Sequence, residues 1–185
     1  MAALRPRLLG TFLFARLGSS GSQVSLAYAY WVGATGAPNL SKAIAWARRA
    51  AFGGNVSGQL FLGNRLCQRG DRGDLEESAR WYKVAADLGN LPALISLATC
   101  FEFGDGVEKD LTKAFELRRV AADRGSADAQ LYVGRCLQVG QNVPRNLEDA
   151  LRYARMATAS GTGEANALAA SILADISSRD CEPLE

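Results

Sequence analysis

Few residues in this chain of 185 could do chemistry, and their spacing does not assemble a catalytic site. Neighbouring carboxylates, which can divide acid and base roles between them, occur at Glu76-Glu77 and at Glu148-Asp149. Both pairs fall on the first turn of a predicted helix, where negative charge complements the helix dipole, so we interpret them as structural. Histidine, the commonest general base, is absent from the sequence. We therefore predict no catalytic residues and no enzyme activity.

The four cysteines are the other candidates for chemistry, and they stand at Cys67, Cys100, Cys136 and Cys181. None is part of a C-x-x-C pair, the spacing that zinc sites favour, so we predict no metal site and no cofactor. Buried thiols that behave as small apolar side chains are the favoured interpretation. The alternative, a thiol- or cofactor-handling protein that uses its free cysteines, stays open.

Charge is distributed unevenly along the chain. Residues 1–70 contain eight Lys and Arg and no acidic residue, whereas residues 71–185 contain 13 basic and 19 acidic residues. The net charge of the whole chain is only +2, which argues against a dedicated nucleic-acid-binding protein. An RNA-associated role for the acid-free half is the least favoured alternative, and it requires steeply salt-dependent binding. With 48% apolar and 22% charged residues, the composition is that of a chain with a packed core.

Glycines recur along the chain at a nearly constant spacing. Gly18, Gly54, Gly89, Gly125 and Gly161 are separated by 36, 35, 36 and 36 residues, and a Ser, Asn or Thr follows each of them. Glycine closes a helix in a left-handed conformation, and Ser, Asn or Thr caps the N-terminus of the next helix. Pairs of Asn or Asp with Leu repeat with the same period, at Asn39-Leu40, Asp74-Leu75, Asp110-Leu111 and Asn146-Leu147. Each pair predicts the start of a second helix in its unit.

Helical pairs of this size are expected to stack, because one pair alone cannot bury enough apolar surface to fold. We therefore predict an all-α fold, an α-solenoid of antiparallel helix pairs that forms a right-handed superhelix. The predicted units span residues 19–54, 55–89, 90–125 and 126–161, a half unit at 162–176 closes the stack, and residues 177–185 form a tail.

Short motifs recur in register within these units. The clearest are Gly104-Asp105-Gly106-Val107, Asp110-Leu111-Thr112-Lys113-Ala114, Trp81-Tyr82 and Ala85-Ala86. Together they resemble the Sel-1-like repeat family, a relative of the tetratricopeptide repeat, over residues 19–176. Single units depart from the pattern: the first lacks Gly-x-Gly-Val, and the third has Leu117 in the place of Trp. The resemblance implies a non-enzymatic scaffold for protein–protein interaction, a subunit or assembly factor of a larger and mitochondrial complex.

A solenoid offers its exposed first-helix positions to a protein partner. The positions that vary most between units supply the candidate partner-binding residues, which are Phe61, Asn64, Thr99, Phe103, Tyr132 and Arg135. Phe61, Tyr132 and Arg135 are the favoured anchors, because aromatic residues and arginine dominate binding hot spots. Tolerance to solvent, or contact with the next helix, explains the same variation equally well. We expect no small-molecule substrate and no nucleic acid partner.

Residues 1–18 carry Arg5, Arg7 and Arg16 in an apolar stretch without an acid, a composition typical of a mitochondrial targeting segment. Two interpretations stay open, a targeting segment and a degenerate helix that caps the stack, because Gly18 keeps the register of the later glycines. Membrane association is expected only through this segment. We expect a mitochondrial protein, with the cytoplasm as the alternative.

Overall fold

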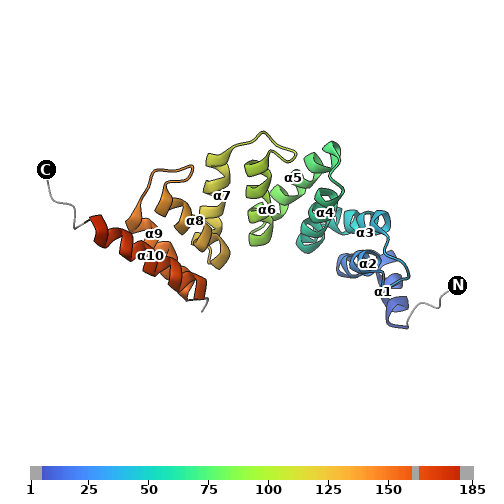
Figure 1. Ribbon diagram of the computed structural model, residues 1–185. Coiled ribbons are helices and arrows are strands. Elements are labelled where there is room, and N and C mark those ends of the chain that lie inside the picture. Colours follow the sequence, from blue (N-terminus) through green and yellow to red (C-terminus); the bar gives the residue numbers. More distant parts are fainter. Residues whose placement is uncertain (1–5, 160–162, 180–185) are drawn as a thin grey trace. The chain divides into compact units, whose positions relative to one another are not determined.

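The computed structural model describes residues 6–159 and 163–179, and every regular element in these ranges is a helix (Figure 1). The helices group into two compact units. Unit 1 reaches Cys100 and includes Gly104–Glu108, while unit 2 holds Phe101–Phe103 and continues from Lys109. The helices of the described ranges are α1 (Pro6–Arg16), α2 (Ser20–Val32), α3 (Leu40–Phe52), α4 (Val56–Arg69), α5 (Arg72–Asp87), α6 (Leu91–Phe103), α7 (Leu111–Asp123), α8 (Ala127–Val139), α9 (Leu147–Thr158) and α10 (Gly163–Arg179). The predicted all-α fold is confirmed for these residues.

Most helix boundaries lie where the glycine and cap pattern predicts them. The caps whose side chains accept a bond from the first turn of the next helix are Ser19, Asn39, Asn55, Asn90, Asp110, Ser126 and Asn146. The glycines before the first helices are left-handed, with φ of +96° at Gly18, +77° at Gly54, +86° at Gly89 and +92° at Gly125. The predicted boundary at residues 161–162 lies outside the described residues, and α10 runs past its predicted end at 176.

One predicted helix start, at Asp74-Leu75, is wrong. Helix α5 begins at Arg72, and Asp71 stands before it without making a side-chain cap bond. Asp74 lies in the first helical turn instead, and its carboxylate forms an ion pair with Arg69, with Oδ2 at 2.9 Å from Nε. The turn between α4 and α5 is short, so the chain enters the helix before it reaches the predicted cap.

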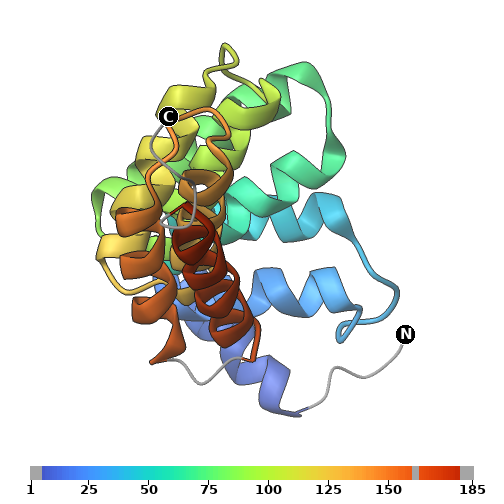
Figure 2. The same cartoon turned by 60° about the vertical axis from the view of Figure 1, so that its left-hand side comes forward.

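Each unit has its core between successive helices, and neighbouring helices lie side by side (Figure 2). In unit 1 the cluster between α2, α3 and α4 consists of Ala27, Ile44, Ala47, Ala51, Leu62 and Leu66. In unit 2 the cluster between α8, α9 and α10 includes Leu131, Leu147, Ala150, Ala154, Leu168 and Ile172. Small residues let the helices approach closely: a Cβ added to Gly63 would lie 2.6 Å from the ring of Tyr82.

A repeated side-chain bond joins α1 to α2, α3 to α4 and α7 to α8, whereas α6 has Leu94 at the equivalent position. The amide nitrogens of three buried glutamines, Gln23, Gln59 and Gln130, donate to the carbonyl oxygens of Ala15, Ala51 and Ala122 at 3.1, 3.4 and 3.0 Å. Each of these carbonyl oxygens also accepts a backbone N–H, from Gly18, Gly54 or Gly125, so the glutamine adds a second bond at the helix end. Helix α1 therefore stands before α2 as α3 stands before α4. Within the described ranges, no helix combines the length and apolar character that crossing a bilayer requires.

Candidate functional site

Unit 1 presents a group of aromatic rings on its first helices α2 and α4. Tyr28 and Trp31 lie one turn apart on α2, with their ring centroids 5.5 Å apart. Phe61 of α4 packs edge to face with both, at 6.4 Å from Tyr28 and 6.0 Å from Trp31. The guanidinium of Arg65 lies 4.1 Å from the Trp31 centroid and 5.3 Å from that of Phe61. Tyr28 is exposed and the other three are half-buried; we call these four residues the aromatic surface.

Arg65 is a cation without a carboxylate partner on this surface. Burial lowers the pKa of its guanidinium from the ordinary value, although an arginine stays charged at neutral pH. Its Nη1 atom donates to Oε1 of Gln68 at 2.9 Å. None of the ion pairs in the described part of the chain involves Arg65. The aromatic surface therefore combines apolar rings with an arginine that a partner's carboxylate can pair with.

Sequence reasoning identified Phe61 but missed Arg65 beside it. The equivalent positions in the other units hold Ala29, Cys100 and Cys136, all of them buried. An arginine at a position where the other units have Ala or Cys is a signal that was present in the sequence. The stacking of this arginine on rings from two helices could not be read from the sequence.

Two of the predicted partner-binding residues, Asn64 and Thr99, make bonds inside unit 1. The hydroxyl of Tyr82 donates to Oδ1 of Asn64 at 2.8 Å, which holds the Tyr82 ring against Gly63. The hydroxyl of Thr99 donates to the carbonyl oxygen of Ile95 at 3.1 Å, within α6. Both residues are half-buried and have structural contacts.

Unit 2 holds a second group, in which Arg118 of α7 joins Glu102 to Tyr132 of α8. Nη1 of Arg118 pairs with Oε2 of Glu102 at 2.6 Å, and the guanidinium lies 4.0 Å from the Tyr132 ring centroid. The Tyr132 hydroxyl lies 3.5 Å from Oε1 of Glu102. The pKa of the Tyr132 hydroxyl is raised above its ordinary value, mainly by burial. Tyr132 is thus packed within unit 2, with only part of its surface available to a partner.

The remaining predicted residues, Arg135 and Phe103, differ in their engagement. Arg135 pairs with Glu164 of α10, and both side chains are exposed. Phe103 is exposed over 67% of its surface and is the last residue of α6, a position equivalent to the exposed Val139 at the end of α8. Of the six predicted residues, Phe103 is the most open to solvent in the described structure.

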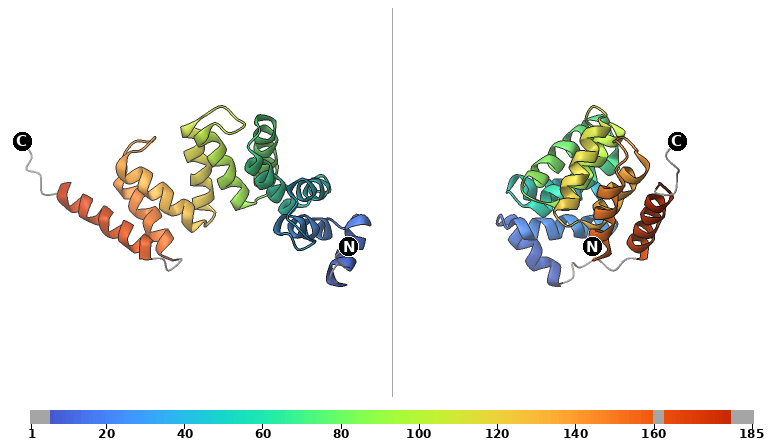
Figure 3. Two further views of the ribbon diagram at one scale, coloured as in Figure 1. Left: turned by 45° about the vertical axis from the view of Figure 1, so that its right-hand side comes forward. Right: turned by 90° about the vertical axis from the view of Figure 1, so that its left-hand side faces the viewer.

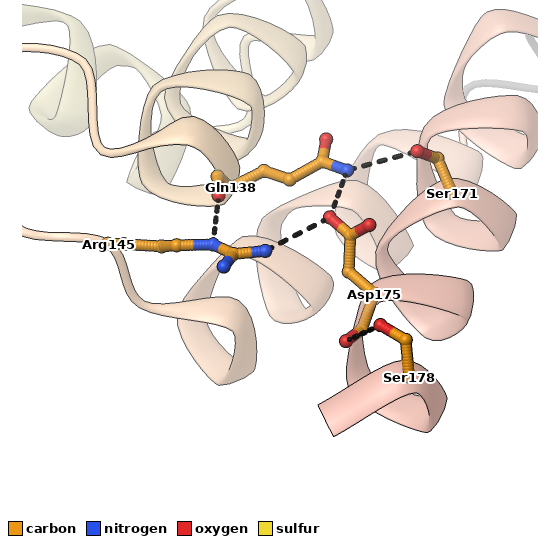
Figure 4. Close-up of polar contacts among 5 residues, drawn as sticks. All are labelled: Gln138, Arg145, Ser171, Asp175 and Ser178. Atoms are coloured by element: carbon orange, nitrogen blue, oxygen red, sulfur yellow. Dashed lines mark hydrogen bonds and ion pairs between the residues drawn. The ribbon is translucent and has the colours of Figure 1, made fainter. Parts of the chain in front are cut away.

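Helices α8 and α10 are further joined by a polar network (Figure 4). Nε2 of Gln138 donates to Ser171 at 3.0 Å and to Asp175 at 2.9 Å. Arg145 donates to the Gln138 carbonyl at 2.8 Å and reaches Asp175 at 3.4 Å. The network holds α10 against α8. Its polar groups bond to one another, so we assign the network a structural role.

A model of the Sel1 repeat matches the chain four times, at residues 20–55, 56–90, 91–126 and 127–162. The chain belongs to the Sel1 repeat family. The resemblance inferred from the motifs is thereby confirmed, and so is the α-solenoid fold, while the hand of the superhelix stays a prediction. Proteins with Sel1 repeats are generally scaffolds for protein–protein interaction and typically have no catalytic role.

Two solved structures share the fold of these Sel1 repeats. The Sel1 repeat protein from Oxalobacter formigenes has a TM-score of 0.76 and 24% identity, over 84% of this chain and 64% of that chain. The protective antigen c5321 of uropathogenic Escherichia coli has a TM-score of 0.51 and 22% identity, over 91% of this chain and 44% of that chain. The chain therefore spans less than two thirds of either protein. No curated protein matches it.

The Sel1 repeats keep two of their thiols inside the helical packing. Burial raises the pKa of Cys100 to about 12 and also raises the pKa of Cys136. The thiolate is the nucleophile and the metal ligand, so neither thiol is activated at neutral pH. Cys67 is half-buried and free, and Cys181 lies outside the described residues. These surroundings disfavour the thiol-handling alternative.

Alkylation of the folded chain by N-ethylmaleimide at about pH 8 is expected to label Cys67 about tenfold or more faster than Cys100 or Cys136. The physical reason is that a buried protonated thiol reacts only when its helices open. Peptide mass spectrometry after a timed quench measures the rates, and unfolding in urea is the control that should equalise them. A rate at Cys100 equal to that at Cys67 in the folded protein would return the thiol-handling alternative to consideration.

Of the two predicted carboxylate pairs, Glu148-Asp149 lies in the first turn of α9 as expected, whereas Glu76-Glu77 lies beyond the first turn of α5, which begins at Arg72. Both pairs have structural contacts. Glu77 accepts from Arg48 at 2.6 Å and from the Trp81 indole at 3.1 Å. Asp149 accepts from Asn146 and pairs with Arg152 in the first turn of α9. Within the described ranges, no group of three or more Cys, Asp and Glu lies close enough to hold a metal ion.

Proposed function

We propose that this chain is a protein-binding scaffold, a subunit or assembly factor of a larger complex, which holds its partner on the aromatic surface of unit 1. The observation that carries the proposal is the stack of Tyr28, Trp31 and Phe61 with Arg65, in a region that has no acidic residue. Stacked rings form a rigid apolar platform, and such rings with arginine dominate the energetics of protein interfaces. The family supports a binding role in general.

The chemistry of this surface indicates the kind of partner. Rings that are half-buried or exposed favour an apolar or aromatic side chain of the partner. The Arg65 guanidinium favours a carboxylate, because a charge-assisted bond beside apolar rings is stronger than one in water. We therefore propose a peptide segment of a partner protein in which an apolar residue stands close to Asp or Glu.

Selection of random peptides on the immobilised chain tests this function. We expect enriched peptides with an apolar or aromatic residue near Asp or Glu, and Arg65→Met should weaken their binding about tenfold, because it keeps the apolar stem and removes the charge. Tyr28→Ala should weaken binding as well. Leu88→Ala, which alters an exposed apolar residue directly after α5, is the matched control and should bind as the unaltered chain does. Equal binding by all three variants contradicts the proposal.

We also propose that the complex is mitochondrial. The support is the acid-free N-terminal stretch with Arg5, Arg7 and Arg16, whose composition is that of a transit segment. Import of the labelled chain into isolated mitochondria, judged by protection from added protease, tests the location. A chain that stays accessible to protease contradicts it.

A further inference from the structure

Unit 1 has a second group of apolar side chains on α3 and α5, the second helices of two successive repeats, in the blue-to-green part of the ribbon (Figure 3). Phe52, the last residue of α3, is 74% exposed, and its ring packs edge to face on Trp81 of α5 with the centroids 5.2 Å apart. Val84 and Leu88, both exposed, follow Trp81 on the same side of α5 and its end. We call six residues the α3–α5 surface: Trp46, Arg49, Phe52, Trp81, Val84 and Leu88.

Phe52 occupies a position that is acidic in the next two repeats, where Asp87 and Asp123 are exposed. In unit 2 the carboxylate of Asp123 accepts a hydrogen bond from the hydroxyl of Tyr153 at 2.8 Å, and Tyr153 stands at the position of Trp81. Unit 1 therefore has a contact between two rings where unit 2 has a polar bond. Because Phe52 leaves most of its ring in water beside other apolar side chains, this position favours contact with an apolar group from outside the chain.

The polar groups beside these rings are bonded within unit 1. The carboxylate of Glu77 accepts from Arg48 at 2.6 Å and from the indole N–H of Trp81 at 3.1 Å. The only polar atom of the Trp81 side chain thus has its partner inside the chain, and the ring is held in place with part of its surface exposed. Asp87, next to the surface, pairs with Lys83 at 2.9 Å.

Positive charge is in excess on these two helices, which contain six basic and four acidic residues. All four acidic residues form ion pairs, whereas Lys42, Arg49 and Arg80 form none within the described part of the chain. Arg49 and Arg80 are exposed, and the Arg49 guanidinium lies 4.6 Å from the ring centroid of Trp46. The α3–α5 surface therefore attracts negative charge and has no unpaired carboxylate to oppose it.

These features fit a lipid surface better than a protein partner. Tryptophan, phenylalanine and leucine beside arginine form the composition with which proteins lie in the interface of a membrane. Such a contact requires projecting apolar side chains and positive charge, but no directional hydrogen bonds. The carboxylates near the rings are already bonded, so the arginines remain to meet the lipid headgroups.

We propose that unit 1 binds an anionic membrane surface through the α3–α5 surface. Phe52, Trp81 and Leu88 lie at the boundary between headgroups and acyl chains, and Arg49 and Arg80 lie among the lipid phosphates. The contact is outside the N-terminal segment, through which alone the sequence predicted membrane association. It uses α3 and α5 and leaves α2 and α4 to the protein partner, so it does not depend on the partner proposed for the aromatic surface.

Flotation of the whole chain with vesicles tests the proposal. One set of vesicles consists of phosphatidylcholine alone, and the other of equal parts of phosphatidylcholine and phosphatidylserine. We expect binding to the anionic set, weakened about tenfold or more when salt rises from about 0.05 M to about 0.5 M, because salt screens the attraction. A chain that does not float with the anionic vesicles at low salt overturns the proposal, and so does equal binding to both sets.

Phe52→Asp with Leu88→Asp removes the apolar contact and should weaken binding to the anionic vesicles about tenfold or more. The variant should fold, because Asp123 and Arg124 stand at these two positions in the repeat that contains α7. Circular dichroism and thermal unfolding check this. Undiminished binding would place the membrane contact elsewhere, for example in the N-terminal segment, and overturn the proposal.

The matched control is Val120→Asp with Val139→Asp, which adds the same two charges at exposed apolar positions of unit 2. It should bind the vesicles as the unaltered chain does. An equal loss in this control would show that added negative charge, wherever it stands, explains the effect, and it would overturn the assignment to α3 and α5.

The contribution of charge is measured with Arg49→Gln and Arg80→Gln together, which should weaken binding and reduce its dependence on salt. Arg119→Gln with Arg155→Gln removes the same charge from exposed positions of α7 and α9 and should have a smaller effect. Equal effects of the two pairs would mean that the net charge of the chain, and not this surface, attracts the vesicles, which contradicts the proposal.

The three tryptophans of the chain can locate the contact. A variant that keeps only Trp81 (Trp31→Phe, Trp46→Phe) should have its emission quenched by vesicles with brominated acyl chains. A variant that keeps only Trp31 (Trp46→Phe, Trp81→Phe) should bind with little quenching, because Trp31 lies on the aromatic surface. Stronger quenching of Trp31 than of Trp81 overturns the proposed orientation.

A protein partner for the α3–α5 surface is the other possible outcome. Peptide binding by the aromatic surface should be unchanged in Phe52→Asp with Leu88→Asp, which keeps the two proposals distinguishable. If vesicles do not bind and selected peptides lose their binding in this variant, the α3–α5 surface binds protein and the lipid proposal is overturned.

Discussion

Replacement of Gly106 by alanine is expected to lower the free energy of unfolding by about 3 kcal/mol or more. An alanine Cβ here would lie 2.2 Å from the carbonyl oxygen of Leu75 and 2.5 Å from the backbone nitrogen of Glu76. Both atoms belong to the backbone of α5, which cannot turn aside as a long side chain can. Gly106 also has a φ of +72°, a conformation that alanine adopts only with strain.

The matched control for this prediction is Gly70→Ala in the same unit. Gly70 has a nearly equal φ of +76°, and the nearest atom to its added Cβ lies 4.0 Å away. This variant should therefore lose only the conformational contribution, about 1 to 2 kcal/mol. Urea unfolding followed by circular dichroism measures both values. Equal losses would show that the close approach to α5 is not what requires glycine in the Gly-x-Gly-Val motif.

Replacement of Arg118 by alanine is expected to lower the free energy of unfolding by about 2 to 3 kcal/mol. The side chains of Arg118 and Glu102 are only 11% and 24% exposed, and they pair at 2.6 Å. The substitution leaves the Glu102 carboxylate partly buried without its cation, and it also removes the guanidinium that stacks on Tyr132. Arg118→Lys should lower the free energy of unfolding by less than Arg118→Ala does, because lysine keeps the charge but lacks the planar group that stacks on Tyr132.

Arg135 provides the control for the Arg118 prediction, because it pairs with a glutamate of another helix in the same unit. The side chains of Arg135 and Glu164 are 54% and 60% exposed, so water screens their attraction. Arg135→Ala should change the free energy of unfolding by less than about 1 kcal/mol. A loss as large as that of Arg118→Ala would mean that burial does not set the strength of these ion pairs. Thermal and urea unfolding of the four proteins decide between the outcomes.

The helices and their boundaries could be predicted because their signals are local. Asn39, Asp110 and Asn146 cap their helices as expected, since a cap needs only its own side chain and an N–H group three residues on. Asp74 is also followed by Leu, but the predicted helix start at this residue is wrong. The short turn before α5 and the pairing of Asp74 with Arg69 outweigh its capping tendency.

The candidate site was only partly predictable. Phe61 follows from its place in a variable first-helix position, and the structure places it among aromatic rings. Asn64 shares that character but is used by Tyr82, and Arg135 is used by Glu164. Variation at equivalent positions of the repeats indicates on which side of the helix a residue lies. It does not indicate which neighbouring side chain the residue already bonds to.

The sequence by itself determined the repeat, the family, the helices and most of their ends, because these depend on spacing and on contacts within one turn. Only the tertiary structure decided that Arg65 stacks on Trp31 and that Arg118 joins Glu102 to Tyr132. Each of these features depends on how neighbouring helices pack. That packing follows from the fit of whole helix surfaces, which no single position in the sequence encodes.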